Sequence, residues 1–242
     1  MNKKRISGFV RKYLKDVLTL FGHKKLWTQH GYSEDGEDGV LRAFYETRPD
    51  YRGFYVDIGA YHPIHLSNTQ WFYEQGWHGI NIDATPGSMK TFNKIRKRDV
   101  NIETGVSDTS GEMEFLFFGP TSTINKFGAK AHETDGPEGP GEKINVPVQP
   151  INELLDKHVP KGQHIDFITM DVEGFELKIL QSLDFANYAP DFFLIEDLEF
   201  VNRDFMEYLT SPLYALLKSK GYLVVAKTQR TVIFRAGERI DN

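Results

Sequence analysis

The sequence contains no cysteine in its 242 residues. This absence excludes disulfide bonds, a thiol nucleophile, and any zinc or iron–sulfur site that depends on cysteine ligands. A metal ion would have to be bound by oxygen or imidazole ligands. A protein without cysteine fits a reducing compartment, and we expect a cytoplasmic location.

The sequence also lacks a basic excess and long apolar segments. Lys and Arg total 29 against 34 Asp and Glu, a net charge of −5, which does not favour nucleic acid as a partner. No segment approaches the ~20 apolar residues of a membrane-spanning helix. With 40% hydrophobic and 13% aromatic residues, the chain can nevertheless bury a full core.

The basic residues are concentrated at the N-terminus, where residues 1–26 hold eight Lys or Arg and one acid. Apolar residues recur at helical spacing in this segment, which predicts a basic amphipathic helix within residues 1–30. It is not a signal peptide, because its longest uncharged apolar stretch, Val17 to Phe21, is too short. The helix either packs on the rest of the protein or contacts an anionic membrane through residues 1–22, at the inner membrane surface.

Strand and helix patterns alternate after this segment and predict one α/β domain over residues 31–242. Such alternation indicates a mostly parallel sheet with helices on both faces. The last two strands are too close in sequence for a crossover, so they form an antiparallel hairpin. The predicted strands are 53–58, 78–83, 100–106, 165–171, 191–197, 221–227 and 231–235. The predicted helices are 66–76, 87–97, 151–158, 174–183 and 204–220, with another beginning near Val40.

A long connection departs from this alternation. Segments 113–119 and 143–148 have strand patterns and flank a loop of about residues 119–143 that is rich in Gly, Pro and acids. Loops of this length are usually lids, binding loops or disordered segments. We expect Ser122, Asn125 and Lys126 to help form an acceptor site.

Acidic residues follow the predicted strands one after another. Because the carboxyl ends of parallel strands meet at one edge of a sheet, we expect these acids to converge there. Capping of the next helix explains a single acid, such as Asp83, but it does not readily explain the series. The acids are Asp57, Asp83, Asp108, Asp171, Glu196 and Asp197.

The first of these acids restricts the ligand. A dinucleotide places its pyrophosphate on a glycine-rich turn after the first strand, whereas this chain has Asp57 and a single early glycine, Gly59. S-adenosylmethionine carries no phosphate and has a positive sulfonium and ammonium, so acids attract it. Asp83 would accept hydrogen bonds from the ribose, and Asp108 from the adenine amino group. An NAD-dependent oxidoreductase remains as an alternative.

The fourth and fifth strands are followed by further acids, for which three interpretations stay open. Glu173 and Glu176 can complement the dipole at the start of a helix. Asp171 or Glu173 can act as a general base, a role also open to His62 in the first turn. Alternatively, Asp171, Glu196 and Asp197 can bind Mg²⁺ or another divalent cation, an arrangement similar to that of catechol-type O-methyltransferases.

The motifs resemble those of the FkbM-type methyltransferases, which are class I S-adenosylmethionine-dependent enzymes. The resemblance rests on "SEDGED" (33–38), "VDIGAYHPIHLSNTQWFYEQGWHGINIDATP" (56–86), "GVSD" (105–108) and "IDFITMDVEGFELKILQSLDF" (165–185). It implies a Rossmann-like, seven-stranded, mostly parallel sheet with a C-terminal antiparallel hairpin. The motifs and the resemblance together predict cofactor contacts from Glu37, Asp57, Gly59, Ala60, Tyr61, Asn68, Asp83, Ala84, Ser107, Asp108 and Asp171.

The function that we expect is O-methylation of a hydroxyl on a sugar, a glycan or a similar polyol. The acceptor would be a small molecule or a glycan, because the predicted acceptor edge is acidic and no basic patch follows a nucleic-acid backbone. The choice of acceptor class rests on the resemblance. A non-catalytic S-adenosylmethionine-binding domain is the alternative from another functional class.

Overall fold

The structure, a computed structural model, describes residues 31–128, 135–136, 139–201 and 203–237. The chain divides into two compact units, Met1–Gly31 and Tyr32–Asn242, and the features below belong to the second unit. The predicted N-terminal amphipathic helix lies outside the described residues. Within the described ranges, no helix combines the length and apolar character needed to cross a membrane.

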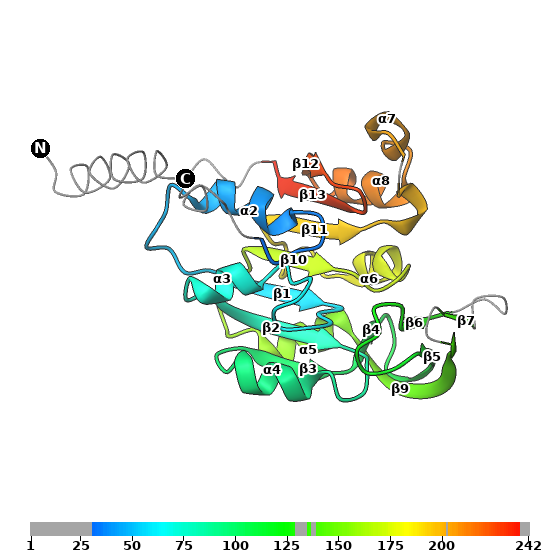
Figure 1. Ribbon diagram of the computed structural model, residues 1–242. Coiled ribbons are helices and arrows are strands. Elements are labelled where there is room, and N and C mark those ends of the chain that lie inside the picture. The colour runs from blue at the N-terminus through cyan, green and yellow to red at the C-terminus, as the bar shows by residue number, and fades with distance from the viewer. Residues whose placement is uncertain (1–30, 129–134, 137–138, 202, 238–242) are drawn as a thin grey trace, which may run out of the picture. The chain divides into compact units, whose positions relative to one another are not determined.

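A seven-stranded sheet forms the centre of the second unit, with the strand order β12-β13-β11-β10-β1-β2-β3 (Figure 1). Neighbouring strands are parallel except at β13, which is antiparallel to both β11 and β12. The predicted α/β fold with a mostly parallel sheet and a C-terminal hairpin is therefore confirmed. The strands are β1 (Phe54–Ile58), β2 (His78–Asp83), β3 (Val100–Glu103), β10 (Phe167–Met170), β11 (Phe192–Glu196), β12 (Tyr222–Lys227) and β13 (Thr231–Ala236).

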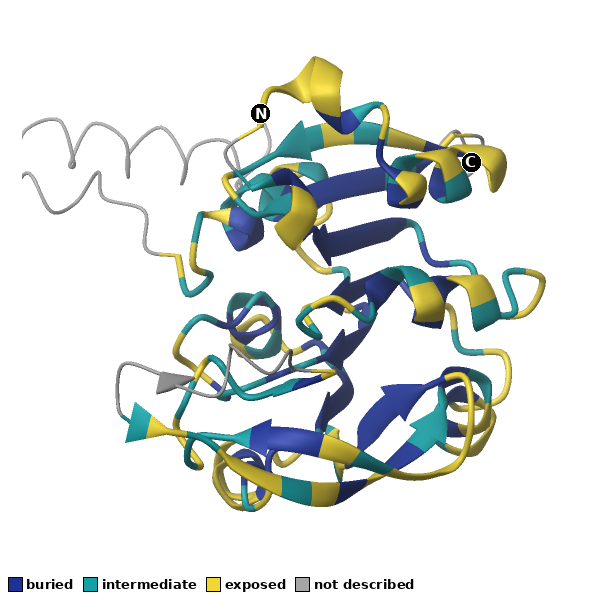
Figure 2. Cartoon of the chain, turned by 90° about the vertical axis from the view of Figure 1, so that its right-hand side faces the viewer, coloured by how far each residue is buried: buried dark blue, intermediate teal, exposed yellow. Residues whose placement is uncertain are grey.

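Helices cover both faces of this sheet, so its central strands are buried on both sides (Figure 2). One face packs against α5 (Ile151–His158), α6 (Glu176–Ser182) and α8 (Pro212–Ser219). The other packs against α2 (Glu37–Tyr45) and α3 (Gln70–Glu74). The helix α4 (Met89–Ile95) buries Met89 and Phe92 beside the loop that follows β1.

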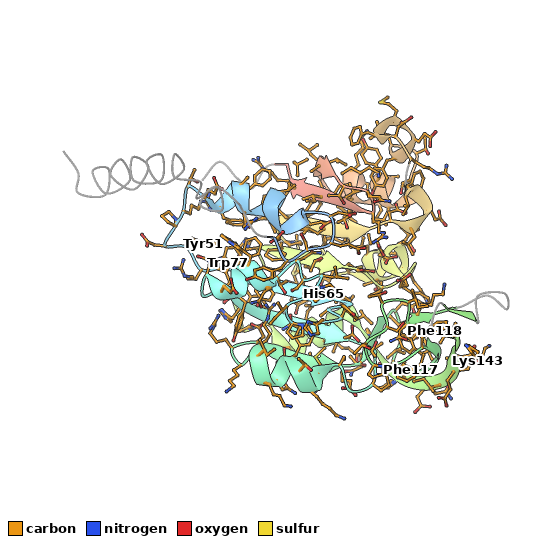
Figure 3. The ribbon with its side chains drawn as sticks, in the orientation of Figure 1. Tyr51, His65, Trp77, Phe117, Phe118 and Lys143 are labelled. Atoms are coloured by element: carbon orange, nitrogen blue, oxygen red, sulfur yellow. The ribbon has the colours of Figure 1, made fainter. Side chains whose placement is uncertain are left out.

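An aromatic cluster closes the sheet at the amino ends of β1 and β2. Tyr51 and Trp77 meet edge to face with ring centroids 5.6 Å apart (Figure 3). The Tyr51 hydroxyl donates to Asp166 Oδ1 over 2.7 Å, and Asp166 Oδ2 accepts from the Phe54 amide over 2.8 Å. These contacts hold the end of the sheet that lies away from the carboxyl ends of the strands.

The predicted helix over residues 204–220 is wrong in its continuity. The chain forms α7 (Phe205–Tyr208) and then α8, which begins at Pro212. The Ser211 side chain accepts a hydrogen bond from the Leu213 amide, and Pro212 stands at the first helical position. A capping serine followed by proline starts a new helix, so the apolar periodicity continues across a break.

The predicted strand over residues 100–106 is also two strands, β3 and β4 (Gly105–Ser107). Thr104 lies at the change of sheet. Its amide donates to the Asp83 carbonyl over 2.9 Å, which continues the pairing with β2. Its hydroxyl donates to the Pro147 carbonyl over 3.0 Å, in the second sheet.

That second sheet has four strands in the order β4-β9-β5-β6, and the sequence did not predict it as a separate layer. It lies on the side toward which β10 and β11 point, with Phe117, Phe118 and Lys143 labelled on it (Figures 1 and 3). Phe115, Phe127, Val146 and Val148 form its buried core. Its other strands are β5 (Gly111–Phe117), β6 (Lys126–Phe127) and β9 (Glu142–Pro150); the short elements are β7 (Asp135–Gly136), β8 (Gly139–Pro140) and η3 (Leu198–Phe200).

Candidate functional site

A cavity of about 370 Å³ lies at the carboxyl ends of β1, β2, β10 and β11. This is where open α/β sheets bind their ligands. We call its two extremes, set by the strand order, the β2/β3 end and the β10/β11 end. The β2/β3 end is lined by Asp83, Ala84, Thr85, Thr104, Gly105 and Val106. The β10/β11 end is lined by Glu34, Asp35, Glu37, Asp171, Glu173, Glu196, Leu198 and Arg230.

The turn after β1 forms the centre of the cavity floor. Gly59 has φ +80°, and a Cβ atom there would lie 1.7 Å from the Asp171 carbonyl oxygen. The Gly59 and Ala60 amides both donate to the Ile82 carbonyl, over 2.9 and 3.0 Å. Gly59 is therefore required first by the close approach of the chain after β10, which is a packing reason that the sequence did not reveal. Ala60 is buried and does not line the cavity.

Asp83 joins this turn to the end of β2. Its Oδ2 accepts from the Tyr61 amide and its Oδ1 from the Thr85 amide, each over 2.8 Å. Burial raises the pKa of Asp83, and the hydrogen bonds from these two amides oppose that rise. The Tyr61 hydroxyl donates to the Thr121 carbonyl over 3.0 Å, so the turn also contacts the predicted lid.

Asp57 does not line the cavity, although the sequence predicted it as a cofactor contact. Its Oδ2 accepts from the Thr69 hydroxyl over 2.8 Å, at the start of α3. The guanidinium of Arg96, which is fully buried, also contacts Thr69 Oγ1. Burial raises the pKa of Asp57 to about 6, and the Thr69 hydrogen bond and the Arg96 charge oppose this. Asp57 therefore anchors the start of α3 and does not face the cavity.

Asn68 precedes α3 and does line the cavity, as expected from the family resemblance. Its Nδ2 donates to the Thr169 hydroxyl on β10 over 2.9 Å. This bond joins the loop after β1 to β10 and holds the Asn68 side chain at the cavity wall.

Ser107 and Asp108 lie away from the cavity. Asp108 forms an ion pair with Lys178, with 3.0 Å between Oδ1 and Nζ, and its Oδ1 also accepts from Ser107 Oγ over 3.1 Å. The hydrogen bond from Lys178 lowers the pKa of Asp108. The cavity is instead lined by the residues just before them, Thr104 to Val106, which lie closer to the carboxyl end of β3. The sequence predicts these three residues as part of a strand, so it gives no sign that they line the cavity.

Three carboxylates meet at the β10/β11 end. One oxygen each from Asp171, Glu173 and Glu196 lies within 4.8 Å of the others. Asp171 is exposed to water in the cavity, yet the surrounding protein and the neighbouring Glu196 raise its pKa well above the usual range. Burial raises the pKa of Glu196 to about 7. Desolvation, together with repulsion within this group, therefore disfavours full ionisation of the three carboxylates.

Backbone strain is concentrated around the same cavity. Among the described residues, those other than glycine with positive φ are Tyr61, Leu66 and Glu173, at +52°, +55° and +55°. All three line the cavity. Strained conformations of this kind often mark functional sites, because the surrounding structure must maintain them against their energetic cost.

Asp197 is not part of the carboxylate group, which corrects the predicted metal-ligand set. Consecutive residues at the end of a strand point in opposite directions, so Asp197 faces away from Glu196. Its Oδ2 accepts from the Ser211 hydroxyl over 2.9 Å, at the start of α8. Glu173 takes its place beside Asp171 and Glu196.

Glu176 does not line the cavity, in contrast to Glu173. It is the first residue of α6, and its Oε1 accepts from the Val172 amide over 2.9 Å. The predicted role at the start of a helix therefore applies to Glu176. Glu173 lies before the helix and turns toward the cavity.

His62 is used within its own loop. Its Nδ1 accepts from the Ile64 and His65 amides, over 3.2 and 3.0 Å. Partial burial and the neighbouring His65 lower the pKa of His62. Neither histidine lines the cavity, and Figure 3 shows His65 in the loop after β1. The position of His62 does not support the role of general base that was considered from the sequence.

Glu34 and Glu37, at the entry to α2, contact the hairpin of β12 and β13 at the β10/β11 end of the cavity. Glu37 Oε1 accepts from the Thr228 hydroxyl over 2.9 Å, and Arg230 forms an ion pair with Glu34. Asp38, in contrast, accepts from the Ser33 hydroxyl over 2.7 Å and is fully buried outside the cavity. Glu37, which the sequence predicts as a cofactor contact, thus lines the cavity, whereas Asp38 does not. The contribution of Arg230 had no signal in the sequence.

The predicted lid supplies part of the cavity wall. Ser122, Asn125 and Lys126 line it, together with Phe115 and Phe127 of the second sheet. Asn125 organises the turn, because its Oδ1 accepts from the Phe118 amide over 2.7 Å and its Nδ2 donates to the Gly119 carbonyl over 2.8 Å. Residues 129–134 and 137–138 of the predicted loop lie outside the described residues.

The family model described as "Methyltransferase FkbM domain" matches residues 57–224. A search of curated proteins finds no match.

Two solved structures are distantly similar in fold. One is precorrin-6y C5,15-methyltransferase from Geobacter metallireducens GS-15, with 11% identity, a TM-score of 0.40, and coverage of 81% of this chain and 87% of that chain. The other is 1,6-didemethyltoxoflavin-N1-methyltransferase from Burkholderia thailandensis, with bound 1,6-didemethyltoxoflavin and S-adenosylhomocysteine. It has 12% identity, a TM-score of 0.41, and coverage of 98% of this chain and 92% of that chain.

The family match extends over most of the chain and includes the β1 turn, Asp83 and the carboxylates after β10 and β11. The chain therefore belongs to the FkbM family of S-adenosylmethionine-dependent methyltransferases.

Proposed function

We propose that the chain transfers a methyl group from S-adenosylmethionine to a hydroxyl oxygen of a sugar, a glycan or a similar polyol. The observation that carries this proposal is the polarity of the cavity. Asp83 stands at its β2/β3 end, and carboxylates gather at its β10/β11 end, with the strained turn after β1 between them.

The cofactor suits the β2/β3 end and the centre of the cavity. Each oxygen of Asp83 accepts one amide hydrogen bond, and a carboxylate has further lone pairs that can accept from a ribose hydroxyl in exchange for the Thr85 and Ser88 hydroxyls beside it. Val106, Phe115 and Phe127 offer apolar surface to the adenine ring. The predicted cofactor residues that line the cavity are retained in this proposal: Glu37, Gly59, Tyr61, Asn68, Asp83, Ala84 and Asp171.

The acceptor suits the β10/β11 end. Its lining contains the carboxylates of Glu34, Asp35, Glu37, Asp171, Glu173 and Glu196. Carboxylates accept hydrogen bonds from hydroxyl groups and repel phosphates, which favours a neutral polyol over nucleic acid or a phosphorylated acceptor. Of the cations in the lining, Arg230 is already paired with Glu34.

The reaction needs a positioned hydroxyl and a place for one proton. The hydroxyl oxygen attacks the methyl carbon, the new oxygen–carbon bond forms, and the sulfur–carbon bond breaks. The bonding pair stays on sulfur, so the products are a methyl ether and S-adenosylhomocysteine. The hydroxyl proton passes to a carboxylate at the β10/β11 end, where the expected bases Asp171 and Glu173 lie.

The test is calorimetric binding of S-adenosylmethionine followed by transfer of a labelled methyl group to a panel of glycans and free sugars. We expect a methylated product whose mass rises by one CH2 unit, because a methyl group replaces the hydroxyl hydrogen, and whose label resists mild base, as an ether does. Labelled product on nitrogen or carbon would contradict the proposal.

The same experiment separates the alternatives raised by the sequence. Binding of S-adenosylmethionine without transfer to any acceptor would favour a non-catalytic binding domain. Tight binding of NAD(H) in its place would favour an oxidoreductase. S-adenosylmethionine is the only cofactor on which this proposal depends; a divalent cation at the acceptor is a separate proposal.

Contact of residues 1–22 with an anionic membrane stays a prediction, because this segment lies outside the described residues. Its basis is the local excess of Lys and Arg on an amphipathic pattern. We expect the full chain to co-sediment with vesicles that contain acidic phospholipid, and a chain lacking residues 1–22 to remain in the supernatant. Equal sedimentation of the two chains would contradict it.

A further inference from the structure

The carboxylates of Asp171, Glu173 and Glu196 form a compact group at the β10/β11 end of the cavity. Their oxygens lie within 4.8 Å of one another. No Lys or Arg of the described residues forms an ion pair with Asp171 or Glu196. Like charges at this spacing repel strongly in a partly desolvated site, so a cation beside Asp171 and Glu196 would be stabilising.

A buried atom of Glu196 is the second observation that favours a bound cation here. Glu196 is only 7% exposed and lines the cavity, and its Oε2 has no hydrogen-bond partner among the described residues. Buried carboxylate oxygens are normally paired, because loss of hydration without a new partner is costly. Asp171 and Glu196 share a hydrogen bond when one of them is protonated, but the Oε2 atom of Glu196 takes part in none. A bound cation would satisfy Oε2 and would reduce the repulsion among the three carboxylates.

The backbone also brings the third carboxylate into position at a cost. Glu173 has φ +55° and is followed by Gly174 at +101°. This turn separates Glu173 from the start of α6, where Glu176 is held by the Val172 amide. The strained residue is therefore the one whose side chain joins Asp171 and Glu196.

We propose that Asp171, Glu173 and Glu196 bind one divalent cation of the Mg²⁺ or Mn²⁺ class at the acceptor end of the cavity. Hard divalent cations prefer carboxylate oxygens, and three protein carboxylates leave coordination positions for water or for neighbouring hydroxyls of an acceptor. Binding of the ion stands on the described residues alone. Its role in holding an acceptor diol rests on the proposed function.

The first experiment measures binding of Mn²⁺ alone to the full chain, by loss of the free-ion signal in electron paramagnetic resonance, without S-adenosylmethionine. We expect saturable binding that Mg²⁺ competes away. The variants Glu196→Gln and Glu173→Gln should each weaken binding at least about tenfold, because each removes a charged ligand. Two variants are used so that one that fails to fold does not decide the result.

Asp197→Asn provides the matched control. Asp197 follows Glu196 directly but binds Ser211 outside the cavity, so this variant should bind Mn²⁺ as the wild type does. The absence of saturable binding, or equal binding by the wild type and both Gln variants, would overturn the inference. Loss of binding in Asp197→Asn with retention in Glu173→Gln would also overturn it, in favour of the ligands expected from the sequence.

A second measurement separates this inference from the proposed function. S-adenosylmethionine binding is measured in EDTA, and methyl transfer is compared with EDTA and with Mg²⁺ restored. Cofactor binding and full transfer in EDTA would overturn the cation inference and leave O-methylation standing. Saturable Mn²⁺ binding by a chain that does not bind S-adenosylmethionine would support the cation site and contradict the proposed function.

An ammonium group of the acceptor is the other cation that could fill this site. It would appear as a strong preference, in EDTA, for an amino sugar over the matched neutral sugar, without saturable Mn²⁺ binding. That result would overturn the divalent-cation inference.

Discussion

The carbonyl oxygen of Asp171 lies 1.7 Å from the position that a Cβ atom would occupy at residue 59. The chain after β10 thus packs directly on the turn after β1, and only glycine leaves room for it. Asp171, whose side chain lines the β10/β11 end of the cavity, therefore also fixes the backbone of the turn after β1.

The first prediction concerns this contact. Gly59→Ala should lower the free energy of unfolding by about 3 kcal/mol or more, because the clash is with backbone and the φ angle is positive. Gly162→Ala is the control, since Gly162 has φ +77° with nothing within 4 Å of its Cβ position. It should lose only ~1–2 kcal/mol from the φ angle. Urea unfolding measures both, and equal losses would contradict the packing argument.

The second prediction concerns the cofactor. Asp83→Asn should weaken S-adenosylmethionine binding by ~1–3 kcal/mol, because a charged acceptor for the ribose is lost. Asp108→Asn should bind the cofactor as the wild type does, since Asp108 pairs with Lys178 outside the cavity. Calorimetry of the two variants compares two acids that both follow strands of the sheet. A matching loss in Asp108→Asn would place the adenine differently from our proposal.

The third prediction is a pH dependence of stability caused by Asp57. Its neighbours are Thr69, Arg96, Asp83 and Asp99, and burial raises its pKa from 3.8 to about 6. Because the pKa of Asp57 is higher in the folded protein, protonation of Asp57 stabilises the folded state. This contribution is complete at pH values below the unfolded-state pKa of 3.8 and is lost as the pH rises through about 6. From pH 7 to pH 5, the wild type should gain about 1 kcal/mol of stability relative to Asp57→Asn.

Chemical denaturation of both proteins at several pH values measures this difference. Because Asn retains an oxygen that can accept from Thr69, the comparison isolates the titration of residue 57. A difference between the two proteins that stays constant from pH 5 to pH 7 would show that Asp57 does not titrate in this range.

The fourth prediction concerns the buried hydrogen-bond network of Arg96. Arg96 is fully buried and donates from Nε to Asp99 over 3.0 Å and from Nη1 to Gln70 Oε1 over 2.7 Å. Arg96→Met should cost ~3–5 kcal/mol of stability, because it leaves Asp99 buried without its cation. Arg98→Met should cost less than ~1 kcal/mol, because Arg98 is exposed. Similar losses in both variants would contradict the importance of the buried network.

Much of the fold was predictable from local pattern. The strand of residues 78–83 and the helix of residues 151–158 were predicted with the bounds that the structure shows. The errors arose where a local signal was overridden or overlooked. Ser211 and Pro212 start a new helix inside a continuous apolar pattern, and Thr104 transfers the chain from one sheet to another.

The candidate site was predictable to the level of strand ends. Asp83, Asp171 and Glu196 follow strands and line one cavity, as expected. Asp57 and Asp108 also stand at or near strand ends but do not line the cavity, because the direction of a side chain at a strand end depends on its neighbours. Glu34, Asp35 and Arg230 complete the site from segments far apart in the sequence.

The sequence by itself determined the α/β sheet, its terminal hairpin, the family and the series of acids at one edge, because strand periodicity, connection length and motif residues are local properties. Only the tertiary structure decided which acids face the cavity. Side chains at adjacent strand positions point in opposite directions, and partners such as Thr69, Ser211 and Lys178 draw Asp57, Asp197 and Asp108 away from it. Glu173 reaches the cavity because the fold maintains a strained backbone that no local pattern predicts.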